Sequence, residues 1–248
     1  MTLELYHAAY STCSQKVRLV LAEKDLHFES HLVNLAAKEH LTPEYLRLNP
    51  NGVVPTLVHD GQVVCDSSVI GEYLDEVFPA SPLSPNTPHG RAQMRAWIRY
   101  FEEVATPAIR VPSLNSFFLK QIRPEQAAFQ NFTATLPLRK DFYREMGPEG
   151  FSAEKVDAAF DRLRSVFARV DAALALMGDF LLGDFGLADI VLAPTMVRMI
   201  DLECEHLWSN LPRLAAWSQR IQNRASFPTA YFPGSRLGAG ATPTTGPC

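Results

Sequence analysis

The stretch Leu5–Lys24, L-Y-H-A-A-Y-S-T-C-S-Q-K-V-R-L-V-L-A-E-K, decides the fold. Its apolar residues predict a strand over 3–7 and a helix over 14–24. The turn between them carries three hydroxyls and a thiol, those of Ser11, Thr12, Cys13 and Ser14. A strand that runs directly into a helix places these groups beside the unpaired N–H groups of the first helical turn.

This turn has the chemistry of a sulfur site. The helix dipole is positive there, and the free N–H groups stabilise a bound thiolate. Ser11 and Ser14 have the spacing of a redox Cys-x-x-Cys motif with serine at both ends, which indicates a site for the sulfur of another molecule. The structural alternative is that Ser11 is only an N-cap and Ser14 a first-turn residue.

The bulk composition excludes several classes of protein. The chain has 248 residues, 47% of them hydrophobic, and a net charge of −4. This length fits one large or two small domains of roughly 150 residues. Basic residues form no patch that favours nucleic acid, and no long apolar run or signal sequence indicates a membrane or secreted protein. We expect a soluble cytoplasmic protein.

The cysteines predict neither disulfides nor a metal site. The four are Cys13, Cys65, Cys204 and Cys248. None forms a Cys-x-x-Cys pair, and no cysteine and histidine spacing is typical of zinc. We expect reduced thiols and no bound metal.

Residues 28–65 predict a second strand, a short helix and a hairpin. The strands are expected over 28–33, 53–58 and 62–65, with the short helix after Thr42-Pro43 and a turn at Asp60-Gly61. Pro55 cannot donate to a sheet, so it belongs at an edge or at a strand start. A cis bond between Val54 and Pro55 would turn the Val54 backbone outward, where it can pair with an extended ligand.

Asp66-Ser67-Ser68 precedes an amphipathic helix with apolar residues at helical spacing. Capping is the structural interpretation of Asp66 and Ser67. In the functional interpretation, Asp66 binds an ammonium group, and the Ser67 hydroxyl with the helix N–H groups binds a carboxylate. Together they suit the head group of an amino acid.

The second half of the chain reads as helical. We predict a first domain over 1–79, a proline-rich linker over 80–88, a helical domain over 89–232 and a disordered tail over 233–248. Helices are expected over 89–110, 152–177, 187–200 and 211–224, with an irregular, aromatic-rich section over 111–150. The order of elements predicts a thioredoxin-like α/β domain followed by an all-α domain.

The chain resembles the cytosolic glutathione transferases along almost its whole length. The matching motifs are S-T-C-S-Q-K-V-R-L from Ser11, N-P-N-G-V-V-P-T-L from Asn49, D-S-S-V-I-G-E-Y-L from Asp66 and G-L-A-D-I-V-L-A-P from Gly186. The resemblance implies the glutathione transferase fold, a thioredoxin-like N-terminal domain with an all-α bundle, and glutathione as co-substrate.

The resemblance also implies binding roles. Val54, before cis-Pro55, would pair its backbone with the cysteinyl part of glutathione. Asp66 and Ser67 would hold the γ-glutamyl amine and carboxylate, although the family more often has glutamate or glutamine at the first position. His40 lies where related enzymes place a polar residue near the glycine carboxylate, or is a surface residue.

The thiol-activating residue stays open between two hydroxyls. Ser11 matches the catalytic serine of the zeta class and the cysteine of the omega class. Ser14 aligns with a serine of bacterial β-etherases, which lack a serine at the Ser11 position. Cys13 could form a mixed disulfide with glutathione. The resemblance favours Ser11 and Ser14 jointly as hydroxyl donors to the thiolate over Cys13.

One departure from the family lies in the second domain. Gly186 stands where many members place the serine or threonine of a capping box, while Asp189 is kept. We interpret Asp189 as structural.

Within the family, the chain looks most like the bacterial β-etherases that cleave aryl ethers of lignin-derived compounds. This resemblance rests on M-T-L-E-L-Y, the hairpin at 59–61, R-A-Q-M-R-A-W from Arg91 and the insertion 111–150. It implies a small aromatic substrate whose phenolate is displaced by the glutathione thiolate. The insertion has phenylalanines that could line an aromatic pocket or belong to the core: Phe117, Phe118, Phe129 and Phe142.

Two other functions fit the same motifs. The S-T-C-S-x-x-V-R pattern also suits a zeta-like isomerase or dehalogenase. A non-catalytic protein with this fold would bind ligands or partners without turnover. The resemblance further implies a homodimer, as is usual for such transferases.

Overall fold

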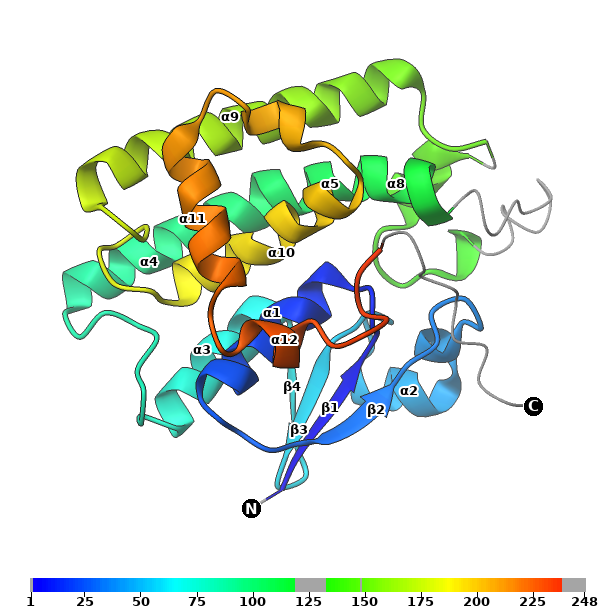
Figure 1. The fold of residues 1–248 in the computed structure, drawn as a ribbon. Coiled ribbons are helices and arrows are strands. Elements are labelled where there is room, and N and C mark those ends of the chain that lie inside the picture. The colour runs from blue at the N-terminus through cyan, green and yellow to red at the C-terminus, as the bar shows by residue number, and fades with distance from the viewer. Residues whose placement is uncertain (1, 119–132, 148, 238–248) are drawn as a thin grey trace.

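A computed structural model describes residues 2–118, 133–147 and 149–237. A small sheet lies on one side of the molecule and a layer of helices on the other (Figure 1). The strand order is β2-β1-β3-β4. The strands are β1 Leu3–His7, β2 Glu29–Leu32, β3 Thr56–His59 and β4 Gln62–Cys65. β1 pairs parallel with β2, and the β1–β3 and β3–β4 pairs are antiparallel.

Two helices cover the sheet on the side of the helical layer. α1, Thr12–Glu23, packs against α3, Ser67–Val77, and also against the helical layer. The expected apolar residues of α1, from Val17 to Leu21, are buried. α2, Pro43–Leu48, and the short η1, Glu39–Leu41, follow β2. This is the predicted thioredoxin-like half. β2 and β4 match the expected bounds within one residue. β3 begins three residues later than expected, at Thr56, because Pro55 cannot donate to the sheet.

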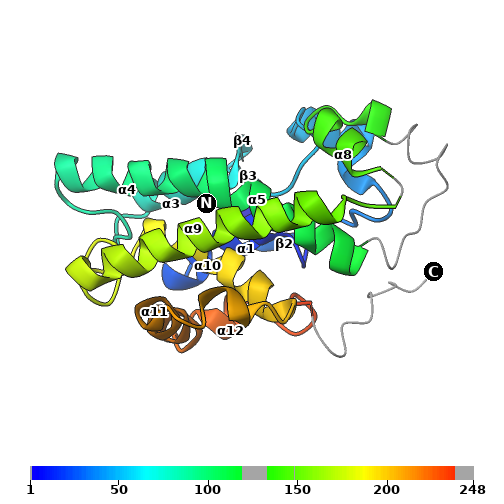
Figure 2. The same ribbon diagram turned by 90° about the horizontal axis from the view of Figure 1, so that it is seen from above.

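The helical layer is built around α10, Leu187–Asp201, which is buried along nearly its whole length. Viewed from above, α9 runs across this layer, while α11 and α12 lie to one side (Figure 2). The other helices are α4 Pro88–Tyr100, α5 Thr106–Ser113, α8 Lys140–Met146, α9 Ala153–Met177, η4 Glu205–Trp208, α11 Pro212–Gln222 and α12 Phe227–Ala230.

The helix predicted over 89–110 is longer than expected. α4 passes through a π-helical turn, η2 at Phe101–Ala105, into α5, and a second π-helical turn, η3 at Leu114–Phe118, follows. The expected helix already ran through Pro107 but ended at Arg110, two residues before Pro112, which lies inside α5. Pro107 stands in the first turn of α5, where its missing N–H costs least, and the helical path continues past Pro112 as well.

The interdomain linker is tied to the first domain. The Lys24 ammonium group donates to the Asp75 carboxylate at 2.7 Å and to the carbonyls of Ala80 and Ser81 at 3.2 and 3.0 Å. Lys24 is buried, so these three oxygens replace its hydration. The domain boundaries that we assign from sequence remain a prediction.

The start of the expected tail is folded. Ser235 and Leu237 are buried, and Arg236 forms an ion pair with Asp201 of α10 at 2.6 Å. The segment has few apolar residues, which is why the sequence predicted disorder, but a buried carboxylate gives it a polar partner. Residues 238–248, with Cys248, lie outside the described part of the chain.

Gly186 and Asp189 show why the capping box is altered. A Cβ atom at Gly186 would lie 2.3 Å from the Leu83 carbonyl oxygen, so serine or threonine does not fit. The buried Asp189 carboxylate accepts the Gly186 amide at 3.2 Å and the Trp217 indole N–H at 2.7 Å. These contacts confirm that Asp189 is structural.

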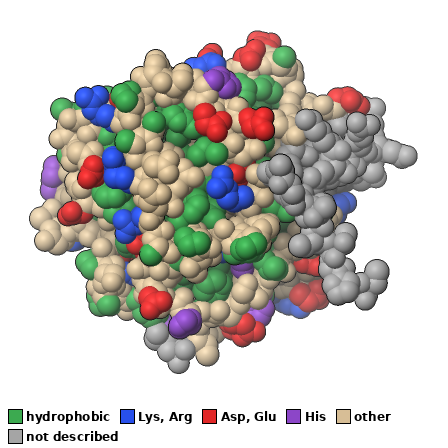
Figure 3. All heavy atoms as spheres, viewed as in Figure 1, with side chains coloured by type: hydrophobic (Ala, Val, Ile, Leu, Met, Phe, Trp, Pro, Cys, Tyr) green, Lys and Arg blue, Asp and Glu red, His purple; other side chains and the backbone are tan. Residues whose placement is uncertain are grey.

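The visible surface carries mixed charge. Basic and acidic side chains are interspersed on the face shown in Figure 3, as the composition led us to expect. None of the helices in the described ranges is both long and apolar enough to cross a bilayer.

Candidate active site

Three loops lie at the same end of the sheet, because the strand register places the ends of β1 and β4 beside the first residue of β3. Tyr6 of β1 pairs with Thr56 of β3, and Thr56 pairs with Cys65 of β4. The turn after β1, the Val54-Pro55 loop before β3 and the Asp66 turn after β4 therefore meet at one end of the sheet. Ligands of α/β proteins commonly bind beyond the carboxyl ends of their strands.

Ser11 caps α1. Its hydroxyl oxygen accepts the Ser14 amide at 3.2 Å, and its carbonyl accepts the Gln15 amide at 2.9 Å. Ser11 and Cys13 are both half-buried at the start of this helix. Ser11 is thus the N-cap of α1, as the structural alternative predicted. Capping uses the hydroxyl oxygen only as an acceptor, so the hydroxyl proton can still be donated to a ligand.

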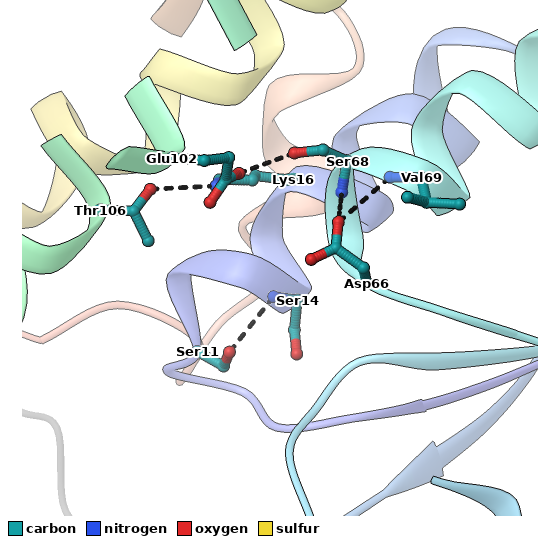
Figure 4. Close-up of polar contacts among 8 residues, drawn as sticks. All are labelled: Ser11, Ser14, Lys16, Asp66, Ser68, Val69, Glu102 and Thr106. Carbon is teal, nitrogen blue, oxygen red and sulfur yellow. Dashed lines mark hydrogen bonds and ion pairs between the residues drawn. The ribbon is translucent and has the colours of Figure 1, made fainter. Parts of the chain in front are cut away.

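Ser14 lies deeper than Ser11. The side chain has no exposed surface, and its oxygen accepts the Ala8 amide at 3.3 Å. Figure 4 shows both serines at the N-terminal end of α1. The Ser14 hydroxyl therefore supports the turn from inside rather than at its surface.

The peptide bond between Val54 and Pro55 is cis, as predicted. The carbonyl of the preceding residue, Val53, accepts the Tyr45 hydroxyl at 2.7 Å and the Asn49 side-chain amide at 2.8 Å. Both side chains also bond the Thr56 hydroxyl. β3 begins only at Thr56, so the Val54 backbone takes no part in the described ladders of the sheet. The sequence alone did not single out Tyr45 and Asn49 as supports of this loop.

Asp66 begins α3. One carboxylate oxygen accepts the amides of Ser68 and Val69 at 2.9 and 3.2 Å, and the other points away from them (Figure 4). The backbone has a φ of +73°, a region that residues other than glycine seldom adopt and that often marks functional sites. Ser67 is the first helical residue, and its hydroxyl has no partner among the described atoms.

A charged network lies behind the start of α3. Glu102 of η2 accepts the Ser68 hydroxyl at 2.6 Å and the Lys16 ammonium group at 2.5 Å (Figure 4). Lys16 also donates to Thr106 at 3.3 Å. Burial acts to raise the pKa of Glu102, but the charge of Lys16 together with the hydrogen bonds from Lys16, Ser68 and Thr106 outweighs it, and the net shift is downward. The network joins α1, α3 and the helical layer, and sequence analysis missed it.

Two buried arginines hold the turn before α1. Arg18 donates to the carbonyls of Ala8 and Ala9 at 3.3 and 3.0 Å, and Arg198 donates to the Tyr10 carbonyl. Burial lowers the pKa of each guanidinium to about 10, so both stay charged at neutral pH. Their side chains come from α1 and from the distant α10, which is why the short motif at 11–19 did not reveal their joint role.

His7, at the end of β1, is neutral. Burial and the neighbouring Arg18 charge lower its pKa to about 4. Its Nδ1 lies 3.2 Å from the Arg18 guanidinium and its Nε2 lies 2.8 Å from the Ser30 hydroxyl. Arg18 can only donate, so Nδ1 accepts and Nε2 carries the proton.

His40 is buried in η1 and is not the surface residue of the alternative interpretation. Its Nδ1 is a buried atom without a hydrogen-bond partner. Burial lowers the pKa of this imidazole. An orphan nitrogen of this kind is uncommon in proteins and suits a ligand contact.

The helical layer adds a cation near the Ser11 turn. Burial, followed by the charge of Arg139, lowers the pKa of Arg110 in α5, and the Cys13 thiol is among the groups that act on it. Phe142 packs on Phe151 with ring centroids 5.0 Å apart, which favours its core role. Phe129 and the side chains of Phe117 and Phe118 lie outside the described parts.

One cluster has metal-binding residue types. Within the described ranges, only Glu4, Glu29 and His31 bring ligand atoms within 4.8 Å of one another. They lie on β1 and β2, and Glu29 is largely exposed. Clusters of exposed carboxylates are common in proteins without a metal, and this one is remote in sequence from the turns that form the site.

Family comparisons agree with this geometry. The model of the glutathione S-transferase N-terminal domain matches residues 10–77, and that of the C-terminal domain matches residues 130–225. Protein LigF of Sphingobium sp. strain SYK-6 is 32% identical over 182 residues, which cover 71% of this chain and 70% of that protein. A zeta-class glutathione S-transferase of Euphorbia esula is 43% identical over 90 residues, covering 36% of this chain and 40% of that protein.

Solved structures give the same result. The crystal structure of β-etherase LigF covers 93% of this chain and 99% of its own, with 30% identity and a TM-score of 0.82. Glutathione transferase F7 from Populus trichocarpa, at 24% identity, covers 92% and 97%, with a TM-score of 0.73. The two domain models, the LigF similarity and the shared fold show that this chain belongs to the glutathione S-transferase family.

Proposed function

We propose that the protein is a glutathione-dependent transferase whose thiolate attacks a small aromatic electrophile, cleaving a β-aryl ether of lignin-derived compounds. The observation that carries this proposal is the similarity to β-etherase LigF over 93% of the chain at 30% identity. A match over both domains bears on the electrophile site as well as on the glutathione site. The resemblance noted in the sequence points the same way.

Glutathione binding uses the three turns that meet at the sheet edge. The Val54 backbone pairs with the cysteinyl part, and the free oxygen of Asp66 binds the γ-glutamyl amine. The Ser67 hydroxyl and amide bind the γ-glutamyl carboxylate at the start of α3. The orphan Nδ1 of His40 lies in the segment after β2, where it contacts the glycine end.

The Ser11 hydroxyl donates to the glutathione thiolate. Because Ser14 is fully buried beneath the Ala8 amide, it supports the turn, and Ser11 makes the contact. Hydrogen bonding to the charged form lowers the pKa of the bound thiol, so no separate base is needed. Cys13 stays a bystander at the half-buried edge of the turn.

The chemical step is a substitution. The thiolate forms a C–S bond at the carbon beside an aryl ketone, and the C–O bond of the ether breaks. The electron pair leaves with the phenolate, which takes a proton from water. Arg110 places a positive charge on the helical side of the turn, where it favours an anionic leaving group.

The zeta-like isomerase or dehalogenase is the second candidate. The zeta-class relative is more identical than LigF, but its match covers only 36% of this chain. A match of this length supports a shared glutathione site more than it supports a shared electrophilic substrate. We also propose a homodimer, because Val63 of β4 and Val69 of α3 are 42% and 55% exposed.

The deciding experiment is incubation with glutathione and a β-aryl ether ketone whose phenol fluoresces on release. Glutathione-dependent release supports the etherase, and its absence with retained glutathione binding by calorimetry overturns it in favour of the isomerase or a binding protein. Light scattering at several protein concentrations tests the homodimer, and a monomer mass would contradict it.

A further inference from the structure

The segment Ser226–Leu237, which we name the C-terminal strap, follows directly after the last residue matched by the C-terminal family model. It includes α12, which packs against α1 (Figure 1). The Gln15 side chain of α1 donates to the Ser235 carbonyl at 3.0 Å in the buried interface. The strap is therefore packed against the helix that begins at Ser11.

Arg18 joins the strap to the turn before Ser11. Its Nε donates to the Ala230 carbonyl at 2.8 Å, while its two other nitrogens bond the carbonyls of Ala8 and Ala9. The guanidinium is planar and its donors point in fixed directions. The Phe232 ring lies over it, with its centroid 5.0 Å from the guanidinium carbon. One rigid group thus sets the position of the turn relative to the strap.

Arg198 makes the second connection, through Asp201. Both oxygens of the buried Asp201 carboxylate are taken by the strap, one by Arg236 at 2.8 Å and the other by the Leu237 amide at 3.0 Å. Asp201 lies close enough for its charge to act on Arg198. Arg198 stands one helical turn before Asp201 on α10, and its guanidinium donates to the Tyr10 carbonyl.

We propose that the C-terminal strap positions the sulfur-binding turn, with Arg18 and Arg198 as its positioning residues. They fix the carbonyls of three consecutive residues, Ala8 to Tyr10, so the Ser11 hydroxyl and the first amides of α1 keep one direction toward the sulfur. This inference rests on the proposed glutathione site. If the strap is released, Ser11 keeps its hydroxyl, but the hydroxyl no longer points at the sulfur. The pKa of the bound thiol then rises.

The test compares Arg236→Met with Arg224→Met. Arg236 ties the strap to Asp201, one helical turn from Arg198. Arg224 forms an equivalent ion pair with Glu23, at 2.5 and 2.8 Å, but at the far end of α1. Each variant removes one cation and one ion pair of the C-terminal region. The readout is the pKa of the glutathione thiol in the binary complex, measured from thiolate absorbance against pH.

We expect Arg236→Met to raise the thiol pKa by about one unit, a tenfold loss of thiolate at a fixed pH below that pKa. Arg224→Met should lower the melting temperature without moving the thiol pKa. Equal thiol pKa values in both variants would overturn the proposal. Arg198→Lys separates position from charge, since lysine keeps the charge but not the planar donors. A normal thiol pKa in Arg198→Lys would also refute positioning.

A ligand-free measurement makes the result independent of the proposed function. The amides of Ser14 and Gln15 bond to Ser11, so their hydrogen exchange reports the order of the turn. We expect faster exchange of these two amides in Arg236→Met and no change in Arg224→Met. Unchanged exchange in both would refute the strap. A wild-type chain that binds no glutathione would refute only the proposed function.

Discussion

The N-terminal ends of α1 and α3 share a position at the edge of the sheet but differ in what they leave free. At α1, the Ser11 hydroxyl takes one amide, that of Ser14. At α3, one Asp66 oxygen takes two amides, those of Ser68 and Val69. The start of α1 therefore keeps its first amides for an anion, whereas α3 keeps one carboxylate oxygen and Ser67 for a group of mixed charge.

The two ends also differ in their support. Two guanidinium groups, Arg18 and Arg198, lie behind the turn at α1. An acid and a base, Glu102 and Lys16, lie behind α3. Positive charge suits the thiolate, and a neutralised pair suits the amino-acid head group, that we propose for these two helix ends. The comparison teaches that the same local element acquires different chemistry from its tertiary neighbours.

The largest effect should come from breaking the Lys16–Glu102 ion pair, which connects α1 with the first turn of α3. Lys16→Met leaves the Glu102 carboxylate without its cation, and we expect the free energy of unfolding to fall by about 3–5 kcal/mol. Burial then raises the pKa of Glu102 with no opposing charge. A raised pKa stabilises the folded state as pH falls, so the difference from the wild type should narrow in acid. Urea denaturation at two pH values measures both.

The control for this prediction is the double variant Lys16→Met, Glu102→Gln. It removes the stranded charge, so most of the lost stability should return. A double variant as unstable as Lys16→Met alone would show that packing of the Lys16 side chain, rather than its charge, joins the two helices.

Ser11→Ala should cost the transition state of the proposed reaction about 3–4 kcal/mol, a 10²–10³-fold loss of turnover. The reason is the loss of the half-buried hydroxyl that we propose as donor to the thiolate. Ser14→Ala is the matched control, because it removes the same atom three residues later. It should leave turnover nearly intact while lowering stability by about 1–3 kcal/mol, since the Ala8 amide loses its partner.

Initial rates and denaturation curves for both serine variants decide between the two hydroxyls. If Ser14→Ala loses as much turnover as Ser11→Ala, the two serines act jointly, as the sequence alone had led us to expect.

His7 should make the α1 end sensitive to acid. Its pKa is about 4 in the folded protein and 6.5 in a free side chain. The unfolded chain therefore binds the proton first, and stability is lost as pH falls from 6.5 toward 4, by on the order of 3 kcal/mol. His7→Gln should flatten this part of the stability curve. Parallel curves for the wild type and the variant would show that His7 is not the titrating group.

Asp66→Asn should have the smallest effect. Asparagine still caps α3, but the charge for the γ-glutamyl amine is lost. We expect KM for glutathione to rise about tenfold, or about 1.4 kcal/mol, with kcat little changed. Steady-state kinetics with glutathione as the varied substrate measure this. A fall in kcat at unchanged KM would instead place Asp66 in the chemical step.

The local pattern was sufficient for most of the fold. Alternating and helical spacing located the four strands and the helices that follow them, and Pro55 marked the loop with the cis bond. The end of the helical path, from 111 into η3, was missed because a proline inside a helical pattern, here Pro112, usually marks its end. The strap was missed because its partners are polar and lie far away in sequence.

The residues of the candidate site were also predicted only in part. The sequence located Ser11, Asp66 and Ser67, since each follows a strand and begins a helix. It could not rank Ser11 against Ser14, because three residues of spacing do not reveal that one hydroxyl is buried. Nor could it find Glu102, which lies far from Ser68 in sequence.

The sequence by itself determined the order of strands and helices, the family resemblance and the residues at the helix starts, because capping and periodicity act over a few neighbouring residues. Only the tertiary structure decided which hydroxyl faces outward, which charges support each helix end and that residues 233–237 pack. Burial and long-range ion pairs depend on elements that meet in space, and their partners leave no mark at fixed spacing in the chain.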